Sequence, residues 1–417
     1  MADASLQTIN DVVCGFCGLG CDDLIVEVEG RDIRAKGAEG GPMCPEAARL
    51  LRRMDVPDQP ARIAGAEASL TEAAGAARRL LGEARAPVFA GLGVDMAGAG
   101  ALADLAVRFG GVLDHYASDG LFANYAAAQR TGWLASTLAE VRNRCDLLLV
   151  VGEDPSQTWA RLFERLFPEN PLFAGSPRKV VFLGSAPGEK ARQQLAGTEI
   201  SHIASDDVVA TLEALGVLVA GKQPPGASFG GVSADQAGEL AAALRAARYA
   251  VVTWNAGTLD EGALVAEYAT KLVDVISVET RAGVFPLGGR DNIIGVNQLL
   301  LWRLGYPMRT AVRGQTSSHD GTLYASGQAL ADADLMVWVS AFRPEPPPSF
   351  AGKVIALAHP DTVFDKEPDI LIPVGTPGVD HAGTVFRMDS IVSLPLGALR
   401  VATLPSVAEA VRCLAEG

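Results

Sequence analysis

The chain has 417 residues, 49% of them hydrophobic, which is enough for about two to four domains with sizeable cores. Its formal net charge of −14 argues against a general nucleic-acid-binding protein, because phosphate backbones attract basic surfaces. No apolar run approaches the ~20 residues of a membrane helix. The start, MADASLQTIN, lacks the basic-then-apolar pattern of a signal peptide, so we expect a cytoplasmic protein.

Residues 1–58 are expected to form a small domain that contains four cysteines. The stretch DDLIVEVEGRDIRAKG predicts two short strands around a turn at Glu29-Gly30. Three cysteines precede this hairpin and Cys44 follows it, so the hairpin would bring Cys44 back beside the others. The Pro- and Gly-rich stretch VPDQPARIAG, residues 56–65, reads as a linker.

Helical and strand-like segments then alternate through the rest of the chain. Ser69 and Glu72 have capping-box spacing at the start of a predicted helix, as do Ser233 and Gln236. Short apolar strands between helices indicate parallel sheets covered on both faces. The predicted strands are residues 86–93, 146–152, 179–184, 249–254, 272–279, 334–340, 353–358 and 369–375.

The stretch GKQPPGASFGG, residues 221–231, is the clearest internal break. We therefore predict an α/β fold with three domains. A four-cysteine domain covers residues 1–58, and two doubly wound, mainly parallel α/β domains cover 59–225 and 226–417. These two halves can interleave.

The four N-terminal cysteines have the spacing C-x2-C-x3-C-x22-C, at Cys14, Cys17, Cys21 and Cys44. Four thiolates suit a [4Fe–4S] cluster or a tetrahedral zinc ion, and the spacing leaves both open. The alternative is four unrelated free cysteines. Glycines at 15, 18 and 20 would let the loop curl so that three sulfurs face one point. Cys145 and Cys413 are expected to be ordinary core thiols.

Other motifs do not point to catalysis. GLGVDM, residues 91–96, lacks the third glycine of a dinucleotide fingerprint and reads as a tight strand-to-helix turn, with a nicotinamide cofactor as the alternative. No P-loop and no GxSxG elbow is present, and none of the five histidines forms a close ligand pair.

Several stretches carry a resemblance to a known family. The four-cysteine spacing followed by α/β halves resembles the molybdenum/tungsten-bispterin oxidoreductases. CGFCGLGCDDLIVEVEG, LAEVRNRCDLLLVVGEDP, GGRDNIIGVNQLLLWRLGYP and GVDHAGTVFRMDSIVSLPL resemble, in the same order, the B subunit of formylmethanofuran dehydrogenase. The resemblance implies a formate dehydrogenase/DMSO reductase-like fold without its C-terminal barrel domain.

The resemblance also implies where chemistry would occur. In the dehydrogenases, a cysteine followed by a histidine serves a tungsten or molybdenum ion held by two pterins. Aligning on Ser118 places Gly120 at the cysteine and Leu121 at the histidine. Glycine offers no ligand and leucine moves no proton, so no metal–bispterin cofactor is expected. Asp119 is the alternative ligand, and Tyr116, Leu121 and Phe122 are expected to fill the former cofactor space.

The resemblance therefore favours the non-redox branch of this family, the bacterial formyltransferase/hydrolase complexes of methylotrophic one-carbon metabolism. It implies a structural subunit without an active site. Its partners would be a formyltransferase, an amidohydrolase-type hydrolase and a further dehydrogenase-like subunit. They pass formyl from formyl-tetrahydromethanopterin to a methanofuran-type carrier and release formate. The alternatives are an active tungsten/molybdenum formylmethanofuran or formate dehydrogenase subunit, and an unrelated zinc- or cluster-binding interaction protein.

Five arginines are candidate ligands for the carboxylates that such a carrier bears. Arg49, Arg52 and Arg53 have helical spacing, while Arg290 and Arg387 lie near Gly-rich or loop segments. The alternative is that these arginines pair with acidic neighbours or with another subunit.

Overall fold

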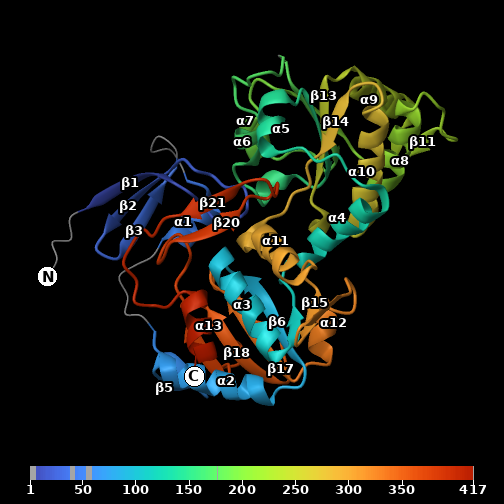
Figure 1. The fold of residues 1–417 in the computed structure, drawn as a ribbon. Coiled ribbons are helices and arrows are strands. Elements are labelled where there is room, and N and C mark those ends of the chain that lie inside the picture. Colours follow the sequence, from blue (N-terminus) through green and yellow to red (C-terminus); the bar gives the residue numbers. More distant parts are fainter. Residues whose placement is uncertain (1–5, 38–42, 53–58, 176, 417) are drawn as a thin grey trace. The chain divides into compact units, whose positions relative to one another are not determined.

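The computed structural model describes residues 6–37, 43–52, 59–175 and 177–416 (Figure 1). The chain divides into two compact units. The first comprises residues 1–118 and 289–417, and the second is the continuous segment 119–288. No helix within the described ranges has the length and apolarity to cross a membrane.

The N-terminal segment forms a small antiparallel sheet. Strands β1 (Gln7–Val12), β2 (Leu24–Glu29) and β3 (Asp32–Lys36) lie in that order, so the predicted hairpin with its turn after Glu29 is confirmed. Helix α1 (Pro45–Leu51) follows Cys44 directly. This segment belongs to the first unit rather than standing alone.

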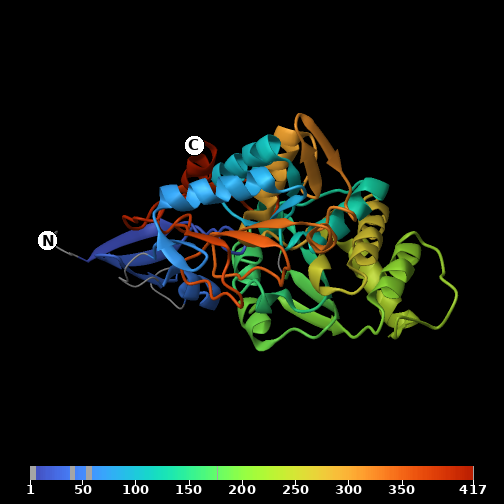
Figure 2. The ribbon, with the colours of Figure 1, turned by 90° about the horizontal axis from the view of Figure 1, so that it is seen from below.

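The first unit is built on a nine-stranded sheet of order β16-β15-β7-β6-β17-β18-β19-β4-β5. Its central strands β7 to β19 run parallel, and antiparallel strands extend both edges. Helices α2 and α3 lie on the same side of this sheet as α13 (Figure 2). The bounds are β4 (Ala61–Ile63), β5 (Ala66–Ala68), α2 (Leu70–Glu83), β6 (Pro87–Gly93), α3 (Met96–Phe109), β7 (Gly111–Leu113), α11 (Ile293–Leu304), β15 (Thr310–Arg313), β16 (Thr316–His319), α12 (Ser326–Ala331), β17 (Leu335–Ser340), β18 (Lys353–Ala358), β19 (Ile370–Pro373), β20 (Gly383–Phe386), β21 (Ser393–Leu396) and α13 (Val407–Glu416).

The second unit holds a five-stranded, wholly parallel sheet of order β10-β9-β8-β13-β14. Apolar residues of β8 and β13 form its core together with helices α8, α9 and α10, which pack on one another. The bounds are α4 (Ser118–Thr131, whose first residue belongs to the first unit), α5 (Leu138–Arg144), β8 (Leu147–Gly152), α6 (Leu162–Leu166), β9 (Lys179–Gly184), α7 (Glu189–Gln194), β10 (Glu199–Ile203), α8 (Val208–Val219), β11 (Ser228–Phe229), β12 (Val232–Ser233), α9 (Ala234–Ala246), β13 (Tyr249–Trp254), α10 (Gly262–Ile276) and β14 (Arg281–Val284).

The two sheets repeat one another. The order β7-β6-β17-β18-β19 in the first matches β14-β13-β8-β9-β10 in the second. Local detail repeats too: the Asp334 carboxylate accepts backbone N–H groups of Arg85 and Ala86, and the Asp146 carboxylate accepts those of Arg248 and Tyr249. Each half of the sequence therefore supplies strands to both sheets.

Because each half of the sequence supplies strands to both sheets, the observed units differ from the expected domains. The expected boundary between residues 225 and 226 lies inside the second unit, between α8 and α9, which pack on each other. The expected halves 59–225 and 226–417 correspond to the repeat in strand order, but each half contributes strands to both sheets.

Most local predictions are confirmed, and three are wrong. Both capping boxes form, at Ser69 and at Ser233. Residues 272–279 were expected to be a strand, but 272–276 end helix α10, because Leu272, Val273 and Ile276 continue its buried face. The expected linker contains strand β4, whose residues pair with β19. Cys413 is exposed on α13, whereas Cys145 is buried as expected.

The division into units predicts which fragments of the chain fold when they are produced alone. Residues 119–288 produced alone should unfold in urea in one cooperative transition, because all five strands of their sheet are present. Residues 59–225 alone should show no such cooperative transition, because β6 would lack its neighbour β17 and β8 would lack its neighbour β13. The reverse result, measured by circular dichroism, would contradict the division.

Candidate functional site

The cysteine loop lies between β1 and β2. The N–H of Cys14 donates to the carbonyl of Cys21 at 2.8 Å, which closes the loop. Gly18 has φ 79°. A Cβ there would stand 2.6 Å from the Gly289 backbone, so only glycine fits this turn against its neighbour. Cys44 occupies the position just before α1.

Burial and the neighbouring thiols raise the pKa of two of the cysteines, Cys14 and Cys17. Burial raises the pKa of the Cys14 thiol well above its ordinary value, and Cys17, Cys21 and Cys44 raise it further. Burial likewise raises the pKa of Cys17 to about 12, with Cys21 and Cys44 adding to it. Within residues 6–37, 43–52, 59–175 and 177–416, no three Cys, His, Asp or Glu side chains are arranged to hold a metal ion. Four cysteine thiolates are suitable ligands for zinc or an iron–sulfur cluster, but in this structure the four side chains are not arranged around one common point.

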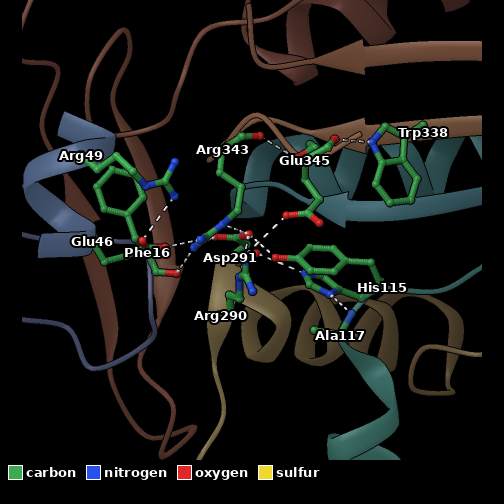
Figure 3. A network of polar contacts seen from close by, with 12 residues as sticks. Phe16, Glu46, Arg49, His115, Ala117, Arg290, Asp291, Trp338, Arg343 and Glu345 are labelled. Atoms are coloured by element: carbon green, nitrogen blue, oxygen red, sulfur yellow. Dashed lines mark hydrogen bonds and ion pairs between the residues drawn. The ribbon is translucent and has the colours of Figure 1, made fainter. Parts of the chain in front are cut away.

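A buried ion pair lies next to this loop. Arg343 and Asp291 are 3% and 0% exposed. The guanidinium donates from Nε to Asp291 Oδ2 at 2.5 Å and from Nη2 to Oδ1 at 2.6 Å, a bidentate pair (Figure 3). Tyr116 also donates its hydroxyl to this carboxylate. Although burial lowers the pKa of Arg343, Asp291 outweighs it and the pKa is raised, so the guanidinium remains charged.

The same guanidinium holds both parts of the cysteine segment. It donates to the Phe16 carbonyl at 3.3 Å and pairs with Glu46, two residues after Cys44. The Asp291 N–H also donates to the Phe16 carbonyl, at 2.9 Å. Partial burial raises the pKa of Glu46, but Arg343 outweighs it and holds the pKa below its usual value. The buried Arg343–Asp291 pair thus holds the cysteine loop and helix α1 against the rest of the first unit.

The backbone beside the pair is strained. Asp291 and Asn292 both have left-handed φ values, 49° and 62°. The Asn292 side chain holds this conformation by donating to the Val94 carbonyl at 2.8 Å and accepting the Phe386 N–H at 2.9 Å. The pair therefore lies where β6 and β17 end, the edge at which parallel α/β sheets usually bind ligands.

His115 completes the network as a neutral side chain. Burial lowers its pKa to about 4. Its Nδ1 accepts the Ala117 N–H at 3.0 Å, which leaves that nitrogen unprotonated, and Nε2 lies 3.4 Å from the Asp291 carbonyl. His115 also stacks on Tyr116, with ring centres 4.7 Å apart.

The segment expected to have lost a metal ligand begins helix α4. Ser118 is buried and accepts hydrogen bonds from Arg309 at 2.8 and 3.2 Å. Asp119 is exposed, and Leu121 and Phe122 are half-buried. A Cβ on Gly120 would stand 2.9 Å from Gly257 N and 3.0 Å from its Cα. The backbone at residue 257 therefore occupies the place where a side chain at residue 120 would begin.

Three of the five candidate anion-binding arginines have acidic partners. Arg49 pairs with Glu46 at 3.3 Å, Arg290 with Glu345 at 3.4 Å, and Arg387 with Asp389 at 2.6 Å. Arg290 also lies over the Tyr116 ring. Arg52 is exposed, and Arg53 lies outside the described residues.

Sequence reasoning missed the central pair. Asp291 follows the candidate Arg290 directly, but neither Asp291 nor Arg343 stood out as a site residue. The two are 52 positions apart, and no local pattern links them. The only local signal was Asp-Asn shortly after two glycines, residues that tolerate left-handed backbone.

The network predicts a large cost for breaking the pair. Arg343→Met should lower the free energy of unfolding by about 3–5 kcal/mol, because the buried Asp291 charge loses its partner. The double variant with Asp291→Asn should cost less than the sum of the two single changes. As a control, Arg303→Met removes an exposed pair with Asp104 and should cost about 0–1 kcal/mol. Equal costs for Arg343→Met and Arg303→Met in urea unfolding would contradict this account.

Comparison with known proteins supports the resemblance seen in the sequence. No family model matches the chain. It is 26% identical to the B subunit of the tungsten-containing formylmethanofuran dehydrogenase 2 of Methanocaldococcus jannaschii over 416 residues, 93% of this chain and 92% of that protein. It is 27% identical to the B subunit of the formyltransferase/hydrolase complex Fhc of Methylorubrum extorquens over 332 residues, 78% of this chain and 87% of that protein.

A solved structure shares the fold. A chain in the crystal structure of the formyltransferase/hydrolase complex FhcABCD from Methylorubrum extorquens, in complex with methylofuran, superposes with a TM-score of 0.73 and 23% identity. The match covers 85% of this chain and 97% of that one. The relatives include a B subunit of a formylmethanofuran dehydrogenase and a B subunit of the formyltransferase/hydrolase complex. The chain is therefore a homologue of both kinds of B subunit.

Proposed function

We propose that this chain is the B subunit of a formyltransferase/hydrolase complex and holds no active site of its own. The complex would pass formyl from formyl-tetrahydromethanopterin to a methanofuran-type carrier and hydrolyse the product to formate. The homologue named for such a complex and the fold shared with a complex that contains methylofuran support this assignment. A formyltransferase, an amidohydrolase-type hydrolase and a further dehydrogenase-like chain would be its partners.

The observation that carries the proposal is Gly120. At this position the dehydrogenases are expected to use a cysteine to hold tungsten or molybdenum. Glycine provides no ligand, and the backbone of Gly257 leaves no room for a side chain at residue 120. Leu121, at the expected histidine position, moves no proton. A chain without this pair has neither the metal ligand nor the acid–base group of carbon dioxide reduction.

The proposed reaction needs no redox centre in this subunit. Formyl transfer and hydrolysis leave the oxidation state of the one-carbon unit unchanged, so no electrons have to enter. Cys14, Cys17, Cys21 and Cys44 would then hold a structural metal, zinc or an iron–sulfur cluster. Such a metal can add ~10 kcal/mol or more to the stability of the structure around its ligands.

An active tungsten or molybdenum dehydrogenase subunit is the second candidate. The longer alignment, 416 residues against 332, favours it. It would need a ligand other than residue 120. Asp119 is the nearest carboxylate in sequence, and it is exposed.

Two arginines are candidate ligands for the methanofuran-type carrier. Arg52 and Arg53 would attract its carboxylates, since Arg49, Arg290 and Arg387 already have acidic partners. Charge reversal at Arg52 and Arg53 together should reduce carrier retention by the complex. Unchanged retention would remove these residues from the proposal.

The contact at Gly120 can be tested by stability. Gly120→Ala should lower the free energy of unfolding by about 1–3 kcal/mol, because the added methyl group overlaps the Gly257 backbone. Gly238→Ala, inside α9 with nothing within 4 Å of the new Cβ, is the matched control and should be neutral or stabilising. If Gly120→Ala and Gly120→Cys both left the free energy of unfolding unchanged, a side chain would fit at residue 120 and this interpretation would be wrong.

The function itself can be tested by reconstitution. The chain should be co-produced with the formyltransferase, hydrolase and dehydrogenase-like subunits. We expect the complex to release formate from formyl-tetrahydromethanopterin when carrier is present, and to reduce no viologen dye with formate. Dye reduction by formate that depends on this subunit would select the dehydrogenase instead.

A further inference from the structure

Three arginines converge on a hollow of about 360 Å³ in the second unit. Each comes from a different element: Arg144 ends α5, Arg248 precedes β13, and Arg281 begins β14. All three are exposed. The hollow lies at the edge where these parallel strands start, away from the edge at which α/β sheets usually bind substrates.

Within the part of the chain that the structure describes, none of these three guanidinium groups forms an ion pair with a carboxylate. Asp146 is the acidic residue among the described lining residues, and its two carboxylate oxygens accept the backbone N–H groups of Arg248 and Tyr249, at 2.8 and 2.9 Å. Elsewhere in the same unit, Arg130 pairs with Glu267. Three like charges at one hollow repel each other unless an anion lies between them.

The rim of the hollow is apolar and held in place. Phe173 lines the hollow and is 63% exposed, and Leu172, which precedes it in the chain, is 73% exposed. The N–H groups of Phe173 and Ala174 both donate to the Asn143 carbonyl at 2.9 Å, which fixes the loop. The Arg144 guanidinium lies 5.4 Å from the centre of the Phe173 ring. Arginine and exposed aromatic side chains on a fixed backbone are typical of the centre of a protein–protein interface.

We propose that this hollow docks an acidic segment of another subunit. Its carboxylates would lie on Arg144, Arg248 and Arg281, and an apolar side chain would cover Leu172 and Phe173. A short acidic segment would contact these arginines alone, whereas an extended phosphate backbone would also run along the rest of a chain whose net charge of −14 repels it. The inference rests on the proposed function, since the partner is a subunit of that complex.

Zero-length cross-linking tests the contact directly. Arg248→Lys keeps the charge and introduces an amine that a carbodiimide joins only to a carboxylate within bonding distance. Arg85→Lys is the matched control, because Arg85 and Arg248 hold equivalent places at the starts of the two sheets. In the co-purified complex, we expect peptide mass spectrometry to find the new amine at position 248 joined to an aspartate or glutamate of a partner subunit, with no such product from the control. A link only to Asp146, or no link, would overturn the proposal.

Charge reversal gives an independent measurement. Arg144→Glu with Arg281→Glu should weaken assembly at least ten-fold, measured by native mass spectrometry of a dilution series, and Arg85→Glu should change it less than two-fold. Equal weakening by both would indicate general electrostatics and overturn the proposal, as would tighter binding of an RNA oligonucleotide than of partner subunits. Failure of the unmodified chain to assemble would instead contradict the proposed function. Full assembly of the double variant would contradict this surface alone.

Discussion

The bidentate pair between Arg343 and Asp291 is the interaction on which the arrangement of the first unit depends. It joins the loop that contains the first cysteines, the helix after the fourth, and the ends of β6 and β17. Both charges are buried, so each is tolerable only while the other is present. Parallel α/β proteins usually bind ligands at this edge, and the buried network of Arg343, Asp291 and Tyr116 lies there.

A second constraint on the fold is that each sheet combines strands from both halves of the sequence. Each sheet becomes complete only when strands from both halves of the sequence have met, because β6 pairs with β17 and β8 pairs with β13. The carboxylates of Asp334 and Asp146 make matching contacts at these two junctions. The repeated strand order is therefore found in two units, neither of which corresponds to one half of the chain.

Local chemistry made much of the fold predictable from the sequence. The capping boxes at Ser69 and Ser233 and the buried strands formed as expected, because the signals lie within a few residues of each other. The strand predicted at 272–279 failed because an apolar run does not distinguish a strand from the buried face of a helix. The Arg343–Asp291 pair and the contact of Gly120 with Gly257 were not predictable, since each joins positions brought together only by the fold.

We propose that this subunit has a metal at its four clustered cysteines and no tungsten or molybdenum ion at residue 120. Metal analysis of the purified native complex, for tungsten, molybdenum, iron and zinc per chain, tests it most directly. We expect no stoichiometric tungsten or molybdenum, and iron or zinc at the four cysteines. About one tungsten or molybdenum ion per chain would contradict it and would identify a redox enzyme.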